Sequence, residues 1–379
     1  MLQKKYFGFG SIKNLKNILN KHKPTSIFLV TGQNSYIKSG AKVILDNFLN
    51  DYNVTHFYDF EENPKIEDIE KGVRIFKESS CDFVVAVGGG SVMDIAKSIN
   101  VLAANLRKPI DYIKNNKKII KNGKILVAVP TTAGSGSEAT KFAVVYINKI
   151  KYSLEHEFML PNYAIVDPQF TISLPEQITA STGMDALSQG IESYWSVNST
   201  NESKKYAKEA IKLVINNLPI VANNQNKKSR EAMAKAAHLA GKAINISKTT
   251  ACHAISYPIT SYFNIPHGHA VALTLASLLE YNYNVTEKDL LDKRGINYVK
   301  KTINEIIHFL GAKDIKEGSR KIENLMIEIG LITRLSDLGI KTDKDINLII
   351  ENGFNLDRVK NNPRKLTKEA VREILDGIR

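Results

Sequence analysis

The sequence predicts an α/β fold of two domains, a parallel-sheet domain followed by an all-helical domain. In the first half, short apolar runs alternate with amphipathic stretches, as in parallel sheets that helices cover on both faces. In the second half, long amphipathic stretches follow one another with few β-rich runs. The chain of 379 residues is also longer than one hydrophobic core usually spans. We therefore expect one domain over 1–167 and a second over 168–379.

The elements of each domain follow from local patterns. Apolar and β-branched runs predict strands over 26–32, 54–60, 82–90 and 124–132. Helical periodicity in the same half predicts helices over 35–52, 65–80 and 91–105. In the second half, the same periodicity predicts helices over 176–193, 202–217, 228–245, 252–263, 269–285, 296–311 and 316–329.

The charge balance is strongly basic, with 52 Lys and Arg against 39 Asp and Glu and a net charge of +13. Such an excess fits either an anionic partner or lysines spread over solvent-facing helices. The lysines are mostly dispersed, which favours the second interpretation. No zinc-finger, RNA-recognition or basic-zipper pattern is present, so we expect no nucleic acid partner.

Neither a membrane nor an oxidising compartment fits the sequence. No apolar run approaches the ~20 residues of a membrane helix. The segment MLQKKYFGFGSIKNL lacks the apolar core of a signal peptide. Cys81 and Cys252, the two cysteines, lie far apart and make no disulfide framework. We therefore expect a cytoplasmic protein with no membrane contact.

A glycine-rich segment, VVAVGGGSVMDIAKSI, contains the end of the predicted strand over 82–90. Glycines there let the backbone approach a ligand closely, and the next helix offers unpaired N–H groups to an anion. The segment lacks the usual Gly-x-Gly-x-x-Gly pattern, and a glycine triplet alone is often a simple turn. Its place at the carboxyl end of a strand favours a phosphate site, with Ser91 and Asp94 close by.

A second segment, VPTTAGSGSEATKF, contains the end of the predicted strand over 124–132. Thr131 and Thr132 supply hydroxyl groups, and a Gly/Ser loop up to Thr140 follows. A plain flexible loop is one interpretation of this segment. Two hydroxyl- and glycine-rich strand ends in one sheet favour a single dinucleotide cradle, which makes the first domain Rossmann-like.

The second domain contains the residue types of a metal site. In GMDALSQGIESYWS, Asp185 and Gln189 lie one helical turn apart and face the same way. His253 and His267 both lie in CHAISYPITSYFNIPHGHA, the second in a Pro-His-Gly turn. One carboxylate and two imidazoles suit iron or zinc and leave room for water or substrate. Two ordinary core histidines are the alternative.

Four segments together resemble the iron-containing (group III) alcohol dehydrogenases over nearly the whole chain: GGGSVMDIAKS, PTTAGSGSEAT, GMDALSQGIES and HAISYPITSYFNIPHG. The resemblance implies the two-domain architecture that this family shares with dehydroquinate synthase, and commonly a homodimer. It also implies hydride transfer between NAD(P)H and a carbonyl, with Fe²⁺ or Zn²⁺ in the helical domain. The residues that match the family's cofactor contacts are Gly89, Gly90, Ser91, Asp94, Thr131, Thr132, Thr140 and Lys151. Those that match its metal ligands are Asp185, His253 and His267.

Two positions depart from the family pattern. Gln189 stands where the family usually has a histidine ligand, and its neutral amide binds metal more weakly than imidazole. Gln189 can coordinate through oxygen, can hydrogen-bond a bound water or the substrate, or can mark a lost metal. Tyr257 replaces a histidine commonly assigned to proton relay, and it can donate a proton or only pack. His269 either supports the metal ligands or is a surface residue.

The turn after the first predicted strand indicates the cofactor. NAD-preferring relatives often have an acidic residue where Gly32 stands, since a carboxylate there bonds the ribose and repels a 2′-phosphate. Gly32 and Ser35 resemble the Gly/Ser turn of the NADPH-preferring branch, with Lys38 one turn further on. We therefore expect NADPH rather than NADH.

The expected substrate is a small aldehyde, reduced to its alcohol. Segments over 140–146, 151–161 and 191–203 resemble the branch linked to phosphonate metabolism, the phosphonoacetaldehyde reductases. Their product is 2-hydroxyethylphosphonate, and Lys141 and His156 are then candidates to hold the phosphonate. The alternatives are another aldehyde, a polyol or a sugar acid, a dehydroquinate-synthase-like lyase, and a cofactor-binding protein without turnover.

Overall fold

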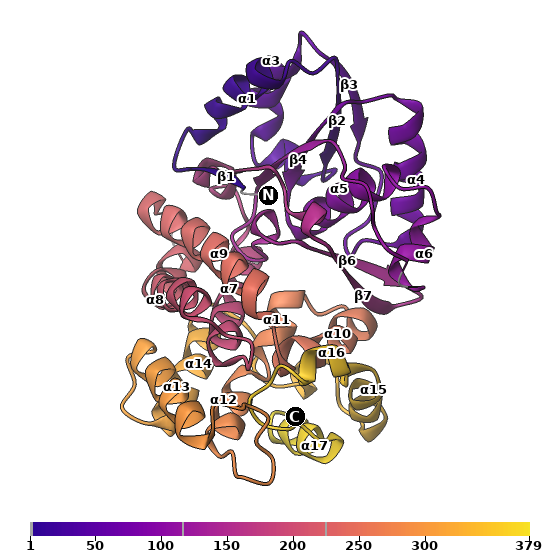
Figure 1. The fold of residues 1–379 in the computed structure, drawn as a ribbon. Coiled ribbons are helices and arrows are strands. Elements are labelled where there is room, and N and C mark those ends of the chain that lie inside the picture. Colours follow the sequence, from indigo (N-terminus) through magenta and orange to yellow (C-terminus); the bar gives the residue numbers. More distant parts are fainter. Residues whose placement is uncertain (1–2, 116, 224–225) are drawn as a thin grey trace. The chain divides into compact units, whose positions relative to one another are not determined.

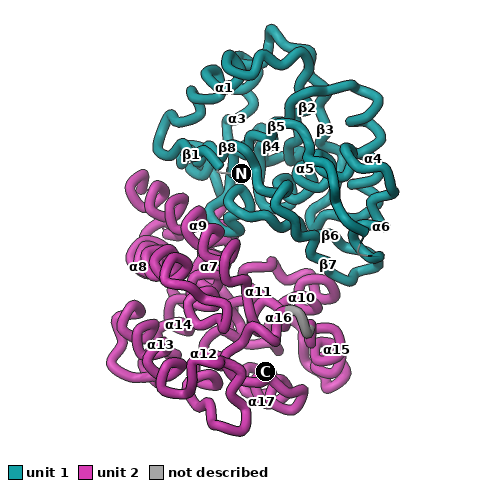
Figure 2. Tube along the Cα trace, viewed as in Figure 1, with its two compact units in different colours: residues 1–174 teal, residues 175–379 magenta. Residues whose placement is uncertain are grey.

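The computed structural model describes residues 3–115, 117–223 and 226–379, and the chain divides into two compact units, residues 1–174 and 175–379 (Figure 2). This boundary lies shortly after the predicted division at 167/168. Phe170, in the 3-10 helix η4 (Pro168–Thr171), is fully buried in a core of the first unit. η4 therefore belongs to the first unit by its packing.

The first unit is built on a parallel six-stranded sheet in the order β1-β8-β5-β4-β2-β3 (Figure 1). Its strands are β1 (Lys4–Phe7), β2 (Ser26–Thr31), β3 (Asn53–Phe57), β4 (Phe83–Gly88), β5 (Ile125–Pro130) and β8 (Tyr163–Val166). β2 and β4 are buried along their whole length, as strands are when both faces of the sheet are covered. The predicted α/β class with a parallel sheet is confirmed.

Helices cover both faces of this sheet. Along β2, Phe28 and Val30 point into one hydrophobic core, while Ile27 and Leu29 point into the other. The helices of this unit are α1 (Asn14–His22), α2 (Ser35–Lys38), α3 (Ala41–Leu49), α4 (Ile66–Glu78), α5 (Gly90–Ala103) and α6 (Pro109–Ile113). Short 3-10 helices are η1 (Ser11–Lys13), η2 (Ser137–Ala139) and η3 (Glu157–Met159).

The sequence did not predict β1, β8, α1 and α6, and two further features of the first unit differ from the prediction. The helix predicted over 35–52 is broken into α2 and α3 by Gly40, whose φ of +76° suits glycine. An antiparallel hairpin of β6 (Phe142–Ile147) and β7 (Ile150–Glu155) was not predicted. Its two-residue turn, Asn148–Lys149, has positive φ at both positions without a glycine, so the usual hairpin signal is missing.

The second unit is helical, as predicted. Its helices are α7 (Glu176–Trp195), α8 (Asn201–Asn223), α9 (Lys227–Ser247), α10 (Ala251–Phe263), α11 (His267–Ala272), α12 (Leu275–Tyr283), α13 (Ile296–Phe309), α14 (Ile315–Glu328), α15 (Asp343–Gly353), α16 (Leu356–Val359) and α17 (Lys368–Gly377), with a 3-10 helix η5 (Ser336–Leu338). The helix predicted over 269–285 is two helices, α11 and α12. α7 packs against α8, α9 and α11 and is buried along most of its length. Among the described helices, none combines the length and the apolar character that crossing a membrane requires.

Candidate active site

Three helices of the second unit bring together the predicted metal ligands. Asp185 lies in the middle of α7, His253 near the start of α10, and His267 is the first residue of α11. Each offers one ligand atom, and these atoms all lie within 4.8 Å of one another. The rings of the two histidines are 5.5 Å apart between centroids and nearly perpendicular. Side chains far apart in the sequence thus converge on one point.

A glycine next to His267 permits this convergence. A Cβ atom on Gly268 would collide with the carbonyl oxygen of Ser181 on α7. The backbone of α11 can therefore approach α7 only because this residue has no side chain. The neighbouring His269 amide donates to Ser181 Oγ at 3.1 Å and fixes the contact.

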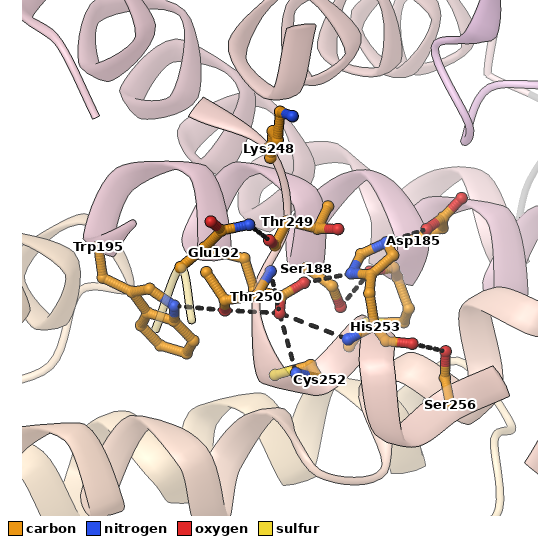
Figure 3. A network of polar contacts seen from close by, with 12 residues as sticks. Asp185, Ser188, Glu192, Trp195, Lys248, Thr249, Thr250, Cys252, His253 and Ser256 are labelled. Atoms are coloured by element: carbon orange, nitrogen blue, oxygen red, sulfur yellow. Dashed lines mark hydrogen bonds and ion pairs between the residues drawn. The ribbon is translucent and has the colours of Figure 1, made fainter. Parts of the chain in front are cut away.

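A buried carboxylate that the sequence analysis missed holds His253. Glu192, on α7, is fully buried, and its Oε2 bonds Nδ1 of His253 (Figure 3). Its Oε1 accepts from the Thr250 amide at 3.0 Å, the Thr250 hydroxyl at 2.7 Å and the Cys252 amide at 2.9 Å. Because Glu192 takes Nδ1, Nε2 of His253 is left to face Asp185. A carboxylate that orients a metal-binding histidine in this way is common around metal ions.

The pKa values in this cluster reflect a balance between the effect of charge pairing and the effect of burial. Burial raises the pKa of Asp185, but its contact with His253 and the charge of His267 outweigh burial and lower it. Burial likewise raises the pKa of Glu192, and His253 outweighs that effect, so this pKa is lowered as well. Burial lowers the pKa of His253, but Glu192 and Asp185 outweigh it and raise the pKa. Both carboxylates are thus held ionised inside the unit.

The cluster fits a divalent cation. Asp185 Oδ1 is buried and accepts no hydrogen bond within the described part of the chain; His253 Nε2 lies 3.4 Å from it. Leaving a buried carboxylate oxygen unsatisfied is costly, and a metal ion bound there would remove that cost. One carboxylate with two imidazoles is a donor set that Fe²⁺ and Zn²⁺ both accept.

The other predicted residues of this site lie beside the cluster. Gln189 is buried on α7 one turn after Asp185 and helps to lower the pKa of Asp185. Tyr257 lies one turn after His253 on α10, with its ring centroid 6.3 Å from that of His267. His269 is buried, and its Nε2 contacts the carbonyl oxygen of Ile332 at 2.6 Å, so it supports packing instead of lying on the surface. The roles of Gln189 and Tyr257 in chemistry stay predictions.

The two cofactor segments predicted in the first unit meet at one edge of the sheet. β4 and β5 pair with Gly88 opposite Pro130, and the Thr131 amide donates to the Gly88 carbonyl at 2.9 Å. A Cβ on Gly89 would lie 3.3 Å from Thr132, and one on Gly90 would lie 3.0 Å from Ser135. The glycines thus let the second segment pass close to the start of α5, as a shared cradle requires.

Other predicted cofactor residues lie on neighbouring elements. Gly32 and Ser35 follow β2, which pairs with β4 in the same sheet. Ser91, in the first turn of α5, accepts through Oγ from the Asn63 amide at 3.2 Å. Lys151 lies on β7 opposite Tyr146 of β6. Their contacts to a cofactor stay predictions.

Asp94 and Thr140 belong to a buried network around Lys97. The ammonium of Lys97 is fully buried and donates to Ser137 Oγ at 2.6 Å, Ser137 O at 3.1 Å, Thr140 Oγ1 at 3.3 Å and the Phe142 carbonyl. Asp94 Oδ1 lies 3.2 Å from it and also accepts from Ser137 Oγ at 2.6 Å. Inside the fold, these groups fix the second cofactor segment to α5. Lys97 was not predicted as part of this site, because a helical lysine is usually solvent-exposed.

Comparison with known proteins agrees with this geometry. Two family descriptions match the chain, "Iron-containing alcohol dehydrogenase" over residues 3–168 and "Fe-containing alcohol dehydrogenase family, C-terminal" over residues 179–378. Long-chain-alcohol dehydrogenase 1 of Geobacillus thermodenitrificans is 36% identical over 64% of this chain and 62% of its own. Phosphonoacetaldehyde reductase of Streptomyces viridochromogenes is 33% identical over 78% of this chain and 75% of its own.

A solved structure is similar over the full length. The crystal structure of sulfoacetaldehyde reductase from Bifidobacterium kashiwanohense, in complex with NAD⁺, has a TM-score of 0.88 and 31% identity, covering 100% of this chain and 99% of its own. An NAD(P)H cofactor and a divalent metal fit such an enzyme. The chain belongs to the iron-containing alcohol dehydrogenases, oxidoreductases that act on alcohols and aldehydes.

Proposed function

We propose that this enzyme reduces phosphonoacetaldehyde to 2-hydroxyethylphosphonate with NADPH. One observation supports the substrate most: a relative by sequence and a relative by structure are named for acetaldehydes that carry a tetrahedral oxyanion, phosphonate in one and sulfonate in the other. In the reaction, C4 of the nicotinamide gives a hydride to the carbonyl carbon, and the carbonyl oxygen takes a proton. The resemblance to sulfoacetaldehyde reductase makes sulfoacetaldehyde the second candidate substrate.

The helical unit supplies the residues for the carbonyl end of the substrate. Asp185, His253 and His267 would hold the metal, with Gln189 as a weaker fourth ligand. A divalent metal at this site, when bound, polarises a carbonyl oxygen and stabilises the developing alkoxide. Glu192 keeps His253 in the required tautomer and orientation. Tyr257 is the proposed proton donor, since its phenol ring lies next to His267.

The turn after β2 supports NADPH over NADH. A Cβ on Gly32 would meet the Ser35 hydroxyl, so an acidic side chain at this position would require that hydroxyl to rotate away. The carboxylate that would repel a 2′-phosphate is therefore absent at Gly32. The ratio of kcat/KM for NADPH to that for NADH tests this proposal, and a clear preference for NADH would overturn it.

Lys141 and His156, the residues that the sequence suggested for the phosphonate, both have partners within the first unit. The Lys141 ammonium pairs with Glu157 Oε1 at 2.6 Å. His156 Nδ1 accepts the Phe158 amide at 3.2 Å and caps η3. Both groups thus have a partner within their own segment, and their contact with a phosphonate stays a prediction.

The substrate proposal is tested with purified, metal-loaded enzyme. We expect kcat/KM for phosphonoacetaldehyde to exceed that for butanal by at least about tenfold, because a charged site discriminates strongly against a substrate without the matching group. Sulfoacetaldehyde is measured alongside. Equal efficiency with butanal would remove the phosphonate from the proposal, and activity with a polyol or sugar acid would move the enzyme to another substrate class. The predicted homodimer and cytoplasmic location stay predictions.

A further inference from the structure

The loop between α9 and α10 contains a lysine in an unusual backbone conformation. Lys248 has φ 62° and ψ 170°, a region that is essentially restricted to glycine. A side chain in this region costs free energy. A glycine would occupy this position at no such cost. Strain of this kind persists where the side chain serves a purpose and the surroundings impose the conformation.

Hydrogen bonds around Lys248 impose this backbone conformation. The Lys248 amide donates to the Ile244 carbonyl at 2.9 Å, and the carbonyl of Lys248 accepts from Ser247 Oγ at 3.3 Å. Ser247 is in turn tied to the end of α7, because Oγ of Ser196, the residue after this helix, donates to its carbonyl at 2.8 Å. On the other side, the Thr249 carbonyl accepts from Asn361 Nδ2 at 3.1 Å. The loop is held at each of these residues, so the backbone position of Lys248 is fixed.

The same loop leads directly to the candidate metal site. After Lys248 and Thr249, the backbone at Thr250 is bound to Glu192, and that carboxylate also holds His253. Figure 3 shows Lys248 and Thr249 on the loop that crosses α7, with Asp185 further along this helix and His253 beside it. Lys248 is partly buried there.

The charge distribution makes Lys248 distinctive. The chain has 52 Lys and Arg residues, yet α7, α10, α11 and α12 contain none of them. Between Lys242 and Lys288, Lys248 is the single lysine or arginine. The helices that carry Asp185, His253 and His267 therefore offer no lysine or arginine that could neutralise a substrate anion, and the loop that leads into α10 offers one.

We propose that the ammonium of Lys248 binds the anionic group of the substrate, and so selects aldehydes that carry a phosphonate or sulfonate over neutral ones. This inference rests on the proposed function. An ammonium paired with a tetrahedral oxyanion makes strong charge-assisted hydrogen bonds. Because the backbone of the loop is already fixed, binding costs no further loop entropy. Lys248 is thus a specificity residue for the anionic end of the substrate.

Lys248→Gly tests the proposal without endangering the fold, because glycine suits the observed φ. We expect kcat/KM for phosphonoacetaldehyde to fall by about 10- to 100-fold, mainly through KM, as loss of one charged hydrogen-bonding partner implies. kcat/KM for butanal should stay within about twofold, and the dissociation constant of NADPH should not change. Lys248→Arg, which keeps the charge, should retain most of the preference. Lys242→Met is the matched control, since Lys242 on α9 contacts Tyr206 instead.

The outcomes separate this inference from the proposed function. An equal loss for both aldehydes, no loss for either, or a weakened affinity for NADPH in Lys248→Gly would overturn the role of Lys248. If the wild type reduces butanal but neither anionic aldehyde, the proposed function fails. In that case, the role of Lys248 is tested by whether 2-hydroxyethylphosphonate inhibits the reduction of butanal. Inhibition that Lys248→Gly abolishes supports an anion site at Lys248, and a wild type that is not inhibited rules it out.

Discussion

The described residues of each unit include a buried cluster of charged groups, and the two clusters are satisfied in opposite ways. In the first unit, the Lys97 ammonium is surrounded by oxygen atoms of Asp94, Ser137, Thr140 and Phe142. In the second unit, two carboxylates face two imidazoles, and Asp185 Oδ1 accepts no hydrogen bond from the described residues. The first cluster is closed and stabilises a segment of the fold. The second is open in the sense that one buried carboxylate oxygen has no hydrogen-bond partner among the described residues, which leaves it available to a metal ion.

Removing the charge of Asp185, the carboxylate with the unsatisfied oxygen, should have the largest effect on activity. Asp185→Asn keeps the shape of the side chain but removes its negative charge, so the cluster should lose its divalent metal. We expect aldehyde reduction to fall by about 1,000-fold or more, since several kcal/mol of charge stabilisation are lost with the metal. Metal content by elemental analysis and kcat/KM measure the two losses together.

Ser188→Ala is the matched control for Asp185→Asn. Ser188 is also buried on α7, and its hydroxyl donates to the carbonyl of Met184 one turn earlier. Metal content and activity should both stay close to those of the wild type. Full metal occupancy in Asp185→Asn would contradict the assignment of Asp185 as a ligand.

Breaking the closed cluster should affect stability first. Lys97→Met leaves the Asp94 carboxylate buried without its cation, and removal of one partner of a buried ion pair costs about 3–5 kcal/mol. We expect the first unit to unfold at lower urea concentration and the affinity for NADPH to fall, while metal content stays unchanged. The combined variant Asp94→Asn/Lys97→Met removes both charges and should recover part of the lost stability. A double variant as unstable as the sum of the single ones would show that the two residues act independently.

The contrast between the clusters also marks what the sequence could predict. Asp185, His253 and His267 were found because metal-binding residue types stand out in apolar helices, and the structure brings them together. Lys97 was missed because nothing in its sequence distinguishes a buried lysine from a solvated one. Its acceptors, at Ser137 and beyond, come from a loop some 40 residues later.

Glu192 was missed for a similar reason, although the sequence contains a signal for it. It lies on the same face of α7 as Asp185 and Gln189, two turns after the first. That spacing alone cannot show that its partners are backbone amides of Thr250 and Cys252. The parallel sheet was predictable because its buried strands are continuous apolar runs. The hairpin of β6 and β7 was not, because a turn of Asn148 and Lys149 lacks glycine.

Glu192→Gln should weaken the candidate metal site of the second unit, with a moderate effect on metal affinity. The amide keeps the size of the carboxylate, but it no longer compensates a positive His253 or strengthens it as a ligand. We expect metal affinity to fall by about 10- to 100-fold, which is the usual effect of losing such a supporting carboxylate. Competition with a chelator of known affinity measures the change, and an unchanged metal affinity would contradict the supporting role.

The same variant has a predictable effect on the pH dependence of the metal-free protein. The folded pKa of His253 is raised above its ordinary value of 6.5. Its contribution to stability is therefore fully present below pH 6.5 and is lost as the pH rises through the folded pKa. Glu192→Gln removes the main cause of the raised pKa, so urea midpoints of the metal-free variant should depend less on pH above 6.5 than those of the wild type.

Gln189→His should have the smallest effect, and it tests whether Gln189 is a ligand of the metal or a contact of the substrate. Gln189 is buried on α7 one turn after Asp185, and imidazole is a better ligand than a neutral amide for iron or zinc. If Gln189 is a weak fourth ligand, the variant should bind metal a few-fold more tightly and still reduce aldehydes. If Gln189 instead contacts the substrate, metal affinity should not change and the preference for phosphonoacetaldehyde over butanal should fall. The two outcomes differ in which quantity moves, so one chelator titration and one pair of kcat/KM values decide between them.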